Sequence, residues 1–262
     1  MTGLVDIHSH ILPGLDDGSG SLGESLDMLA AAAESGVRII TATPHSYMAD
    51  YGDESVREEM FFLLEQLDAE SAAAGIDIRV LPGMEVLIRE NIVPGLQSGR
   101  YLTLNRTSNV LCEFDFEEEP DFMSSRLREI VSAGYTPVVA HPERYRAVRR
   151  DNMLAYHWCL MGCMLQVNKG SLVGAFGDDV AHCAHNLLRW NIVSAVASDA
   201  HSVVTRGTSM NDAVMFITEN YSEEYAVSLL SQRPAAILTD KRDFGRFCSA
   251  REKYSKRNRG DR

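Results

Sequence analysis

Nine histidine, aspartate and glutamate side chains lie at or just after the ends of apolar segments in this 262-residue sequence. The first three occur in the stretch GLVDIHSHILPGLDDGSG, residues 3–20, where one serine separates two histidines and two aspartates follow six residues later. The nine are His8, His10, Asp17, His45, Glu85, Glu113, His141, Asp199 and His201. Proteins build transition-metal sites from imidazole and carboxylate ligands. The pattern therefore predicts metal-dependent chemistry.

The number and kind of these groups indicate more than one ion. His8 and His10 are two residues apart on a predicted strand, so both point to one face, roughly 6.6 Å apart along the chain. One ion needs about four ligands. Nine candidate ligands are better explained by a cluster of ions ~3.5–4 Å apart with bridging carboxylates, as in multi-metal phosphoryl-transfer sites. Mixed imidazole and carboxylate ligands favour Mn, Fe or Zn over Ca or Mg.

Two arginines close to candidate ligands point to an anionic substrate. Arg144 follows His141 in AHPERY, and Arg206 follows His201 by five residues. Three divalent ions, four carboxylates and these two arginines give a local formal charge of about +4. Arginine forks bind phosphate oxygens in a bidentate manner, so phosphate is the leading candidate ligand. The alternative for each arginine is a surface ion pair, such as Arg144 with Glu143.

Apolar, strand-like segments that alternate with helical segments must position these residues. The segments rich in Val, Ile and Leu are residues 4–10, 38–45, 78–86, 109–114, 136–141, 164–169 and 192–201, with helices expected at residues 22–35 and 54–74. Strands without clean alternation are typical of parallel sheets covered on both faces. Because polar residues end all seven segments, the carboxyl face of a barrel explains them better than the crevice of an open sheet. We predict an irregular seven-stranded α/β barrel, one domain over residues 1–240.

Composition excludes several classes of protein. No run of about 18 apolar residues is present, which disfavours membrane insertion. The first residues show no basic stretch followed by an apolar one, so a secretory signal is not expected. Five irregularly spaced cysteines suggest reduced thiols, so a cytoplasmic location is expected. The net charge of −12 disfavours nucleic-acid binding. Residues 241–262 carry nine Lys/Arg and three Asp/Glu and are expected to form a basic, solvated tail.

The sequence resembles the PHP superfamily of metal-dependent phosphoesterases. Within it, the sequence is similar to the CpsB/CapC-type bacterial protein-tyrosine phosphatases of capsule and exopolysaccharide operons. The motifs are DIHSHILPGLDDG, ITATPH, LPGMEV, LCEF, VAHPERY and ASDAH. His-x-His and SDAH mark only the superfamily, whereas the DDG and AHPERY motifs narrow the resemblance to this group.

The resemblance implies a barrel with three metal ions, usually manganese. It places His8, His10, Glu85 and Asp199 around one ion, Glu85, Glu113 and His141 around the second, and Asp17, His45 and His201 around the third. Arg144 and Arg206 resemble the phosphate-binding arginines of the family. It also implies a phosphotyrosine protein as substrate, namely an autophosphorylated tyrosine kinase that controls polysaccharide export. The sequence departs from its relatives at Ser46 and Gly207, where they often have histidine and proline.

The expected mechanism is attack of a metal-activated water on phosphorus, with metals and arginines stabilising the equatorial oxygens. Phenolate, with a solution pKa near 10, needs only modest protonation, for which Asp17, His45 and His201 are candidates. Two other functions stay open: a small-molecule phosphoesterase of the histidinol-phosphatase kind, and a non-catalytic phosphoprotein-binding module. The sequence is also compatible with a homo-oligomer. For Lys169 two alternatives stay open: its side chain faces the site, or it forms a structural ion pair.

One further motif imitates a different class of phosphatase. HCAHNLLR, beginning at His182, has the His-Cys-five residues-Arg spacing of cysteine-dependent tyrosine phosphatases. No glycine lies between Cys183 and Arg189 to form a phosphate-binding loop, and residues 178–190 are expected to be helical. We therefore reject this motif as a catalytic site.

Overall fold

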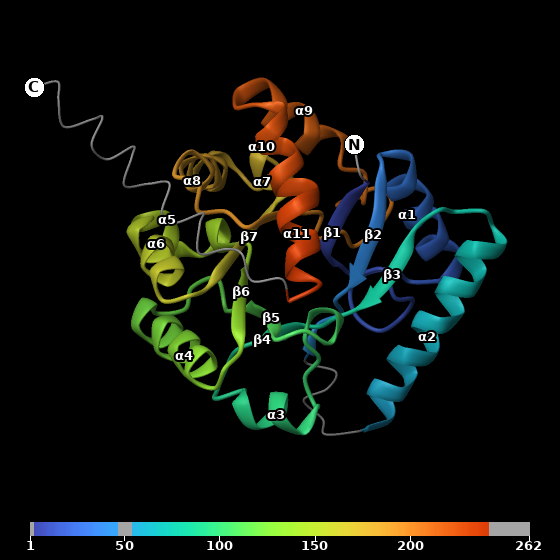
Figure 1. Ribbon diagram of the computed structural model, residues 1–262, viewed down its shortest axis with the longest axis horizontal. Helices are drawn as coiled ribbons and strands as arrows, with labels where there is room; N and C mark the ends of the chain where they lie inside the picture. Colours follow the sequence, from blue (N-terminus) through green and yellow to red (C-terminus); the bar gives the residue numbers. More distant parts are fainter. Residues whose placement is uncertain (1–2, 47–53, 241–262) are drawn as a thin grey trace, which may run out of the picture.

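Parallel strands surrounded by helices build the part of the protein that the structure, a computed structural model, describes: residues 3–46 and 54–240 (Figure 1). The strands are β1 (Leu4–Ser9), β2 (Val37–Ala42), β3 (Arg79–Pro82), β4 (Glu85–Leu87), β5 (Asn109–Glu113), β6 (Thr136–Ala140), β7 (Met164–Asn168) and β8 (Ala195–Ala197). The longer helices are α1 (Leu22–Glu34), α2 (Glu54–Ala73), α4 (Pro120–Ser132), α6 (Met153–Leu160), α8 (Asp178–Arg189) and α9 (Asn211–Asn220). Short helices are α3 (Val93–Ser98), α5 (Arg146–Arg150), α7 (Lys169–Leu172), α10 (Glu223–Val227) and α11 (Arg233–Ile237), with single turns η2 (Leu104–Arg106), η3 (Pro142–Arg144) and η4 (Ser228–Gln232).

The strands form two parallel sheets, in the orders β1-β2-β3 and β4-β5-β6-β7-β8. Two isolated parallel bridges join the sheets, one between Ser9 and Ala200 and one between His45 and Glu85. Ser9 ends β1, His45 and Ala200 follow β2 and β8, and Glu85 begins β4, so both bridges lie among the candidate ligands. The α/β class with parallel strands is confirmed, and the two sheets meet at the end of the molecule that carries the site.

The third predicted strand is divided into β3 and β4, so the seven apolar segments yield eight strands. β3 pairs with β2, whereas β4 pairs with β5, so the chain changes sheets at Gly83 and Met84. A Cβ atom on Gly83 would lie 2.8 Å from Thr41 Cγ2 and 3.0 Å from Thr43 Cγ2. Glycine therefore allows the close passage that this crossing needs.

Two apolar clusters hold the fold together. The inner cluster contains Val5, Leu111, Val138 and Ala197 from four strands, together with Ile237 of α11. Asn109, at the start of β5, donates a hydrogen bond to the Ile237 carbonyl at 2.5 Å, so α11 closes the amino end of the strands (Figure 1). The larger outer cluster lies between the strands and the surrounding helices. The carboxyl ends are thereby left for polar residues.

Local signals fix the helices that the sequence predicts. Ser21 caps α1 by accepting a hydrogen bond from the Glu24 amide at 3.2 Å, and Gly36 follows the helix at a φ of 93°. The expected helices at residues 22–35, 54–74 and 178–190 match α1, α2 and α8 to within one residue at each end. The predicted basic tail, residues 241–262, lies outside the described residues, and the single domain over residues 1–240 stays a prediction. In residues 3–46 and 54–240, no helix has the length and apolar character that crossing a bilayer requires.

Candidate metal centre

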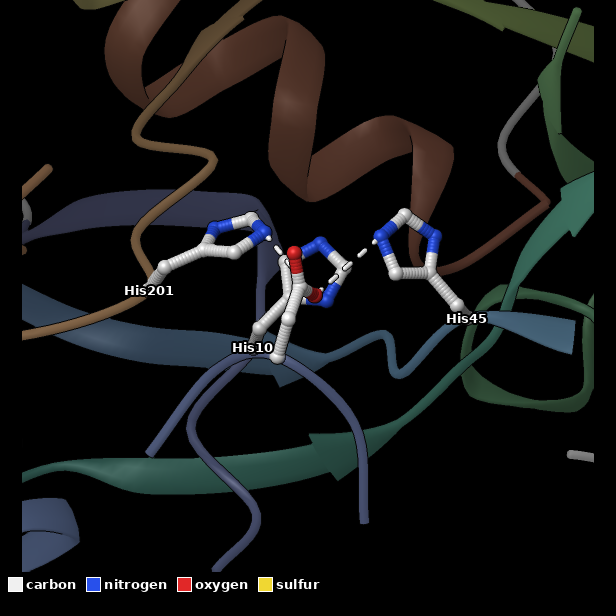
Figure 2. Close-up of side chains that lie close together, drawn as sticks. His10, His45 and His201 are labelled. Atoms are coloured by element: carbon white, nitrogen blue, oxygen red, sulfur yellow. Dashed lines mark ion pairs between the residues drawn. The ribbon is translucent and has the colours of Figure 1, made fainter. Parts of the chain in front are cut away.

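The nine predicted ligands converge at one end of the sheets, where Glu85 begins β4 and the other eight lie near or after the carboxyl ends of β1, β2, β5, β6 and β8. They form overlapping groups whose potential ligand atoms lie within 4.8 Å of one another. The groups are His10, Asp17, His45 and His201; His8, His141 and Asp199; His8, His10 and Glu85; and His45, Glu85 and Glu113. Figure 2 shows the His10, His45 and His201 rings, from the ends of β1, β2 and β8, gathered around one carboxylate. The long-range arrangement that the sequence predicted is therefore present.

The orientations of three imidazoles fit a bound cation. His8 Nδ1 lies 2.8 Å from the Gln166 amide oxygen, and His10 Nδ1 lies 2.7 Å from Asp16 Oδ2. These acceptors place the ring protons on Nδ1, so in the neutral rings the Nε2 lone pairs face each other at 3.3 Å. His201 Nδ1 likewise faces the Asp199 carbonyl oxygen at 3.0 Å, leaving Nε2 toward Asp17 at 3.4 Å. Such an arrangement requires positive charge in the centre, from protons or from metal ions.

Glu85 is the most central carboxylate. It is 1% exposed, and its oxygens lie 3.0 Å from His141 Nε2, 3.0 Å from His45 Nδ1 and 3.2 Å from His8 Nε2. Glu113 lies farther out, 3.4 Å from His45 Nδ1 and 3.7 Å from His141 Nε2. A carboxylate with imidazoles on several sides suits a bridging role between ions.

Asp199 connects the imidazoles to the two arginines. Its Oδ1 lies 3.4 Å from His8 Nε2, while its Oδ2 lies 3.4 Å from Arg144 Nη1 and pairs closely with Arg206 Nη2. The buried Nε of Arg206 has no hydrogen-bond partner among the residues that the structure describes. The two guanidinium groups thus meet at the edge of the cluster, where an anion could accept their remaining N–H groups.

The charges of the cluster shift its pKa values in opposite directions. Burial alone would lower the pKa of His45, but the Glu113 and Glu85 carboxylates outweigh burial and raise it to about 10. Burial, then the nearby His10 and Arg206, lower the pKa of His201 to about 4. Burial would raise the pKa of Asp16, but its hydrogen bond with His10 lowers it to about 2. His201 is therefore neutral at pH 7, whereas the metal-free cluster holds a proton on His45.

Backbone strain occurs at several of these positions. His141, Asp199 and Arg206 have φ values of 33°, 49° and 131°, which are uncommon for residues other than glycine. Such conformations cost roughly 1–3 kcal/mol each and persist where surrounding structure enforces them. All three residues lie in the segments that follow β6 and β8 and belong to the cluster or to its edge.

Sequence reasoning missed the residues that orient the ligands. Asp16 binds His10 Nδ1 and also accepts from the His45 amide at 3.0 Å. Gln166 holds His8 and donates to Asn168 Oδ1 at 2.8 Å, and Asn168 donates to Asp199 Oδ2 at 2.5 Å. Asp16 and Asp17 are adjacent in the DDG motif, so the sequence alone could not show which aspartate supports His10 and which faces the other histidines. The sequence showed Asn168 only as a polar residue at the end of the sixth segment, and Gln166 could have been noted as a second polar residue two positions earlier on this otherwise apolar strand.

Three residues singled out in the sequence lie in structural roles. Lys169 Nζ donates to the Ser209 carbonyl at 2.6 Å, a structural hydrogen bond in place of the ion pair that the sequence suggested. Ser46 Oγ accepts a hydrogen bond from the Leu87 amide at 3.0 Å, so it supports β4. Cys183 is buried within α8, and burial raises its thiol pKa to about 12. A thiol in that state is a poor nucleophile, as expected for the rejected motif.

Comparison with known proteins decides the family. Residues 4–239 match the family described as "Capsular polysaccharide synthesis, CpsB/CapC". The chain belongs to the CpsB/CapC family. It is 36% identical over 243 residues to tyrosine-protein phosphatase YwqE of Bacillus subtilis, covering 92% of this chain and 94% of YwqE. It is 30% identical over 245 residues to tyrosine-protein phosphatase CpsB of Streptococcus pneumoniae, covering 91% and 99% of the two chains.

A solved relative in the CpsB/CapC family shares the fold. It comes from a set of crystal structures of YwqE from Bacillus subtilis and CpsB from Streptococcus pneumoniae, two proteins described as metal-dependent tyrosine phosphatases. The match has a TM-score of 0.81 at 33% identity and covers 90% of this chain and 94% of the solved chain. The family expected from the sequence motifs is thereby confirmed.

Proposed function

We propose that this member of the CpsB/CapC family is a metal-dependent protein-tyrosine phosphatase. The observation that carries the proposal is the joint placement of the nine candidate ligands and two arginines around Glu85 and Asp199. The names of the relatives support the same reaction, hydrolysis of a phosphate monoester on tyrosine.

The proposed ligands are those expected from the sequence: His8, His10, Asp17, His45, Glu85, Glu113, His141, Asp199 and His201. We propose three divalent ions, most readily Mn, with Fe or Zn also matching the imidazole and carboxylate donors. When bound, such ions supply a water of lowered pKa and polarise phosphoryl oxygens. The division of ligands among ions is less simple than the family pattern implies, because the two ring nitrogens of His45 face Asp17 and Glu85.

Arg144 and Arg206 would bind the phosphoryl oxygens. Both reach Asp199 Oδ2, so they can hold an anion at the rim of the cluster without entering its centre. Asp17, with a 63% exposed side chain, lies 3.4 Å from both His45 Nε2 and His201 Nε2. These three residues are the candidates for delivering a proton to the leaving phenolate.

The mouth of the site favours an aromatic, protein-borne phosphate over a sugar phosphate. Phe116 is 38% exposed and its ring lies 5.8 Å from the His141 ring. Val204, in the loop between His201 and Arg206, is 90% exposed. Exposed apolar side chains at a catalytic mouth suit an apolar substrate surface. We propose an autophosphorylated tyrosine kinase of a capsular polysaccharide pathway as the substrate, with hydrolysis taking place in the cytoplasm.

The test is a reconstitution of activity. The protein is stripped of metal with a chelator and then assayed with Mn, Fe, Zn or Mg added singly. We expect phosphotyrosine peptide to be hydrolysed only after metal is restored, and faster than histidinol phosphate or a sugar phosphate. Faster turnover of the small substrates would support the small-molecule phosphoesterase. Binding of the peptide without phosphate release under every metal would support a non-catalytic module and refute the proposal.

A further inference from the structure

A hollow of 710 Å³ opens directly beside the candidate metal centre. Its walls come from the segment after β5, from η3 and α5, and from the loop between α7 and α8. Phe116 and Phe176 supply aromatic surface, and Arg144, Arg149, Asp178 and Asp179 supply charged groups. The hollow combines aromatic and charged surface, as expected for a peptide-binding subsite.

Arg144 lines the hollow and also contacts Asp199 of the candidate metal centre. Its guanidinium carbon lies 4.4 Å from the centre of the Phe116 ring and 4.6 Å from that of Phe176. The same guanidinium reaches Asp199 Oδ2 at 3.4 Å. A phosphate held by Arg144 would therefore lie close to the two aromatic rings, and the group that carries the phosphate could extend along them into the hollow.

The hollow carries charges of both signs: Arg144 and Arg149 are cationic, and Glu117, Asp178 and Asp179 are anionic. Glu117 is paired with Arg146 at 2.8 Å, and Arg149 is turned to the Arg144 carbonyl, to which it donates. Asp178 and Asp179 are exposed in the first turn of α8, and neither forms an ion pair with another described residue. These two carboxylates line the same hollow as Arg144, so they are available to a cationic side chain of a bound substrate.

We infer that this hollow is the subsite for the substrate residues next to phosphotyrosine, and that Asp178 and Asp179 select a lysine or arginine there. The inference rests on the proposed phosphatase function and adds a specificity determinant to it. The phosphate would meet the arginines and the cluster, the tyrosyl ring would lie by Phe116 and Phe176, and the basic side chain would reach the two aspartates. No residue of the candidate metal centre is needed for this selection.

The experiment compares two phosphotyrosine peptides that differ only in lysine or glutamate beside the phosphotyrosine. Each is assayed at low and high salt with the metal-loaded wild type and with Asp178→Asn/Asp179→Asn. The control variant is Glu223→Gln/Glu224→Gln, which removes two exposed acids from the first turn of another helix, α10. p-Nitrophenyl phosphate serves as a substrate with no flanking residues, and melting temperatures confirm that both variants fold.

We expect the wild type to prefer the lysine peptide in kcat/KM. Removal of both aspartates should reduce this preference roughly threefold to tenfold, the range for two exposed ion pairs. High salt should also reduce the preference of the wild type for the lysine peptide, because salt screens exposed charges. The control variant should keep the preference, and all three proteins should hydrolyse p-nitrophenyl phosphate at similar rates.

Two results would separate the failure of this inference from failure of the proposed function. If the peptides are hydrolysed but the preference is absent or is unchanged by Asp178→Asn/Asp179→Asn, the hollow does not select a basic residue. If the metal-loaded protein hydrolyses neither peptide and not p-nitrophenyl phosphate, the phosphatase function itself is wrong.

Discussion

At the scale of single residues, the acceptors behind the imidazoles determine which nitrogen faces the centre. Gln166 engages His8 Nδ1 and Asp16 engages His10 Nδ1, so both rings present Nε2 to the same space. In metal sites, such supporting partners fix the ring orientation and make the ligand more basic. The orientation of His8 and His10 is thus set before any ion binds.

Asp16→Asn tests this support. The substitution removes the charge behind His10 while keeping the size of the side chain, and we expect metal affinity to fall by roughly 10- to 100-fold with the fold retained. Titration of the metal-free protein with Mn measures the affinity, and circular dichroism reports the fold. Asp27→Asn, at an exposed position of α1, is the matched control. Equal affinity of Asp16→Asn and wild type would contradict a supporting role.

The pKa of His45 predicts proton release on metal binding. With a pKa of about 10 in the metal-free protein, His45 is protonated at pH 7, whereas a metal ligand must be neutral. Metal binding must therefore displace the proton, and metal affinity should rise as the pH increases from 7 toward 10. Calorimetry in two buffers of different ionisation enthalpy measures the protons released per ion. Binding at pH 7 without proton release would show that His45 is not a ligand.

Residue types and spacing made the nine candidate ligands predictable, because imidazoles and carboxylates at strand ends have a recognisable chemistry. The supporting residues were not predictable in the same way. Asp16, Gln166 and Asn168 are common side chains, and only their hydrogen bonds show what they do. Phe116 and Phe176 were also missed, because their position around Arg144 depends on loops that no periodicity describes.

At the scale of elements, the crossing from β3 to β4 aligns Glu85 with the end of β2. The bridge between His45 and Glu85 joins the two sheets directly after this crossing, and the Glu85 amide donates to the Pro44 carbonyl at 3.1 Å. The apolar segment at residues 78–86 was read correctly as strand. Its division could not be inferred, because periodicity does not reveal which neighbour a strand pairs with.

Gly83→Ala tests the close passage at this crossing. The added methyl would meet Thr41, Thr43 and Leu104 at 2.8–3.1 Å, and such overpacking costs roughly 1–3 kcal/mol of unfolding free energy. Denaturant unfolding of the metal-free protein measures the change. Gly23→Ala is the control, since its methyl would meet only Ser21 Oγ at 3.9 Å and alanine favours the α1 helix. Equal stability of Gly83→Ala and wild type would show that the passage is not tight.

At the scale of the whole molecule, the fold separates stability from chemistry. Ile237 of α11 closes the inner apolar cluster at the amino ends of the strands, while the candidate ligands occupy the carboxyl ends. This division is typical of α/β barrels, and it made the general architecture predictable from alternating segments. The protein has a net charge of −12. Against this acidic background, a cluster of bound cations would form a local positive site that attracts an anionic substrate.

The metal content of the purified protein tests the central claim most directly. The metal-free protein is loaded with Mn, freed of excess ion by gel filtration, and analysed for metal per chain, beside Glu85→Gln treated in the same way. We predict close to three ions per chain in the wild type and a loss of at least one ion when the central Glu85 carboxylate is removed. A wild-type protein that retains no ion, or a Glu85→Gln variant with unchanged content, would contradict the account.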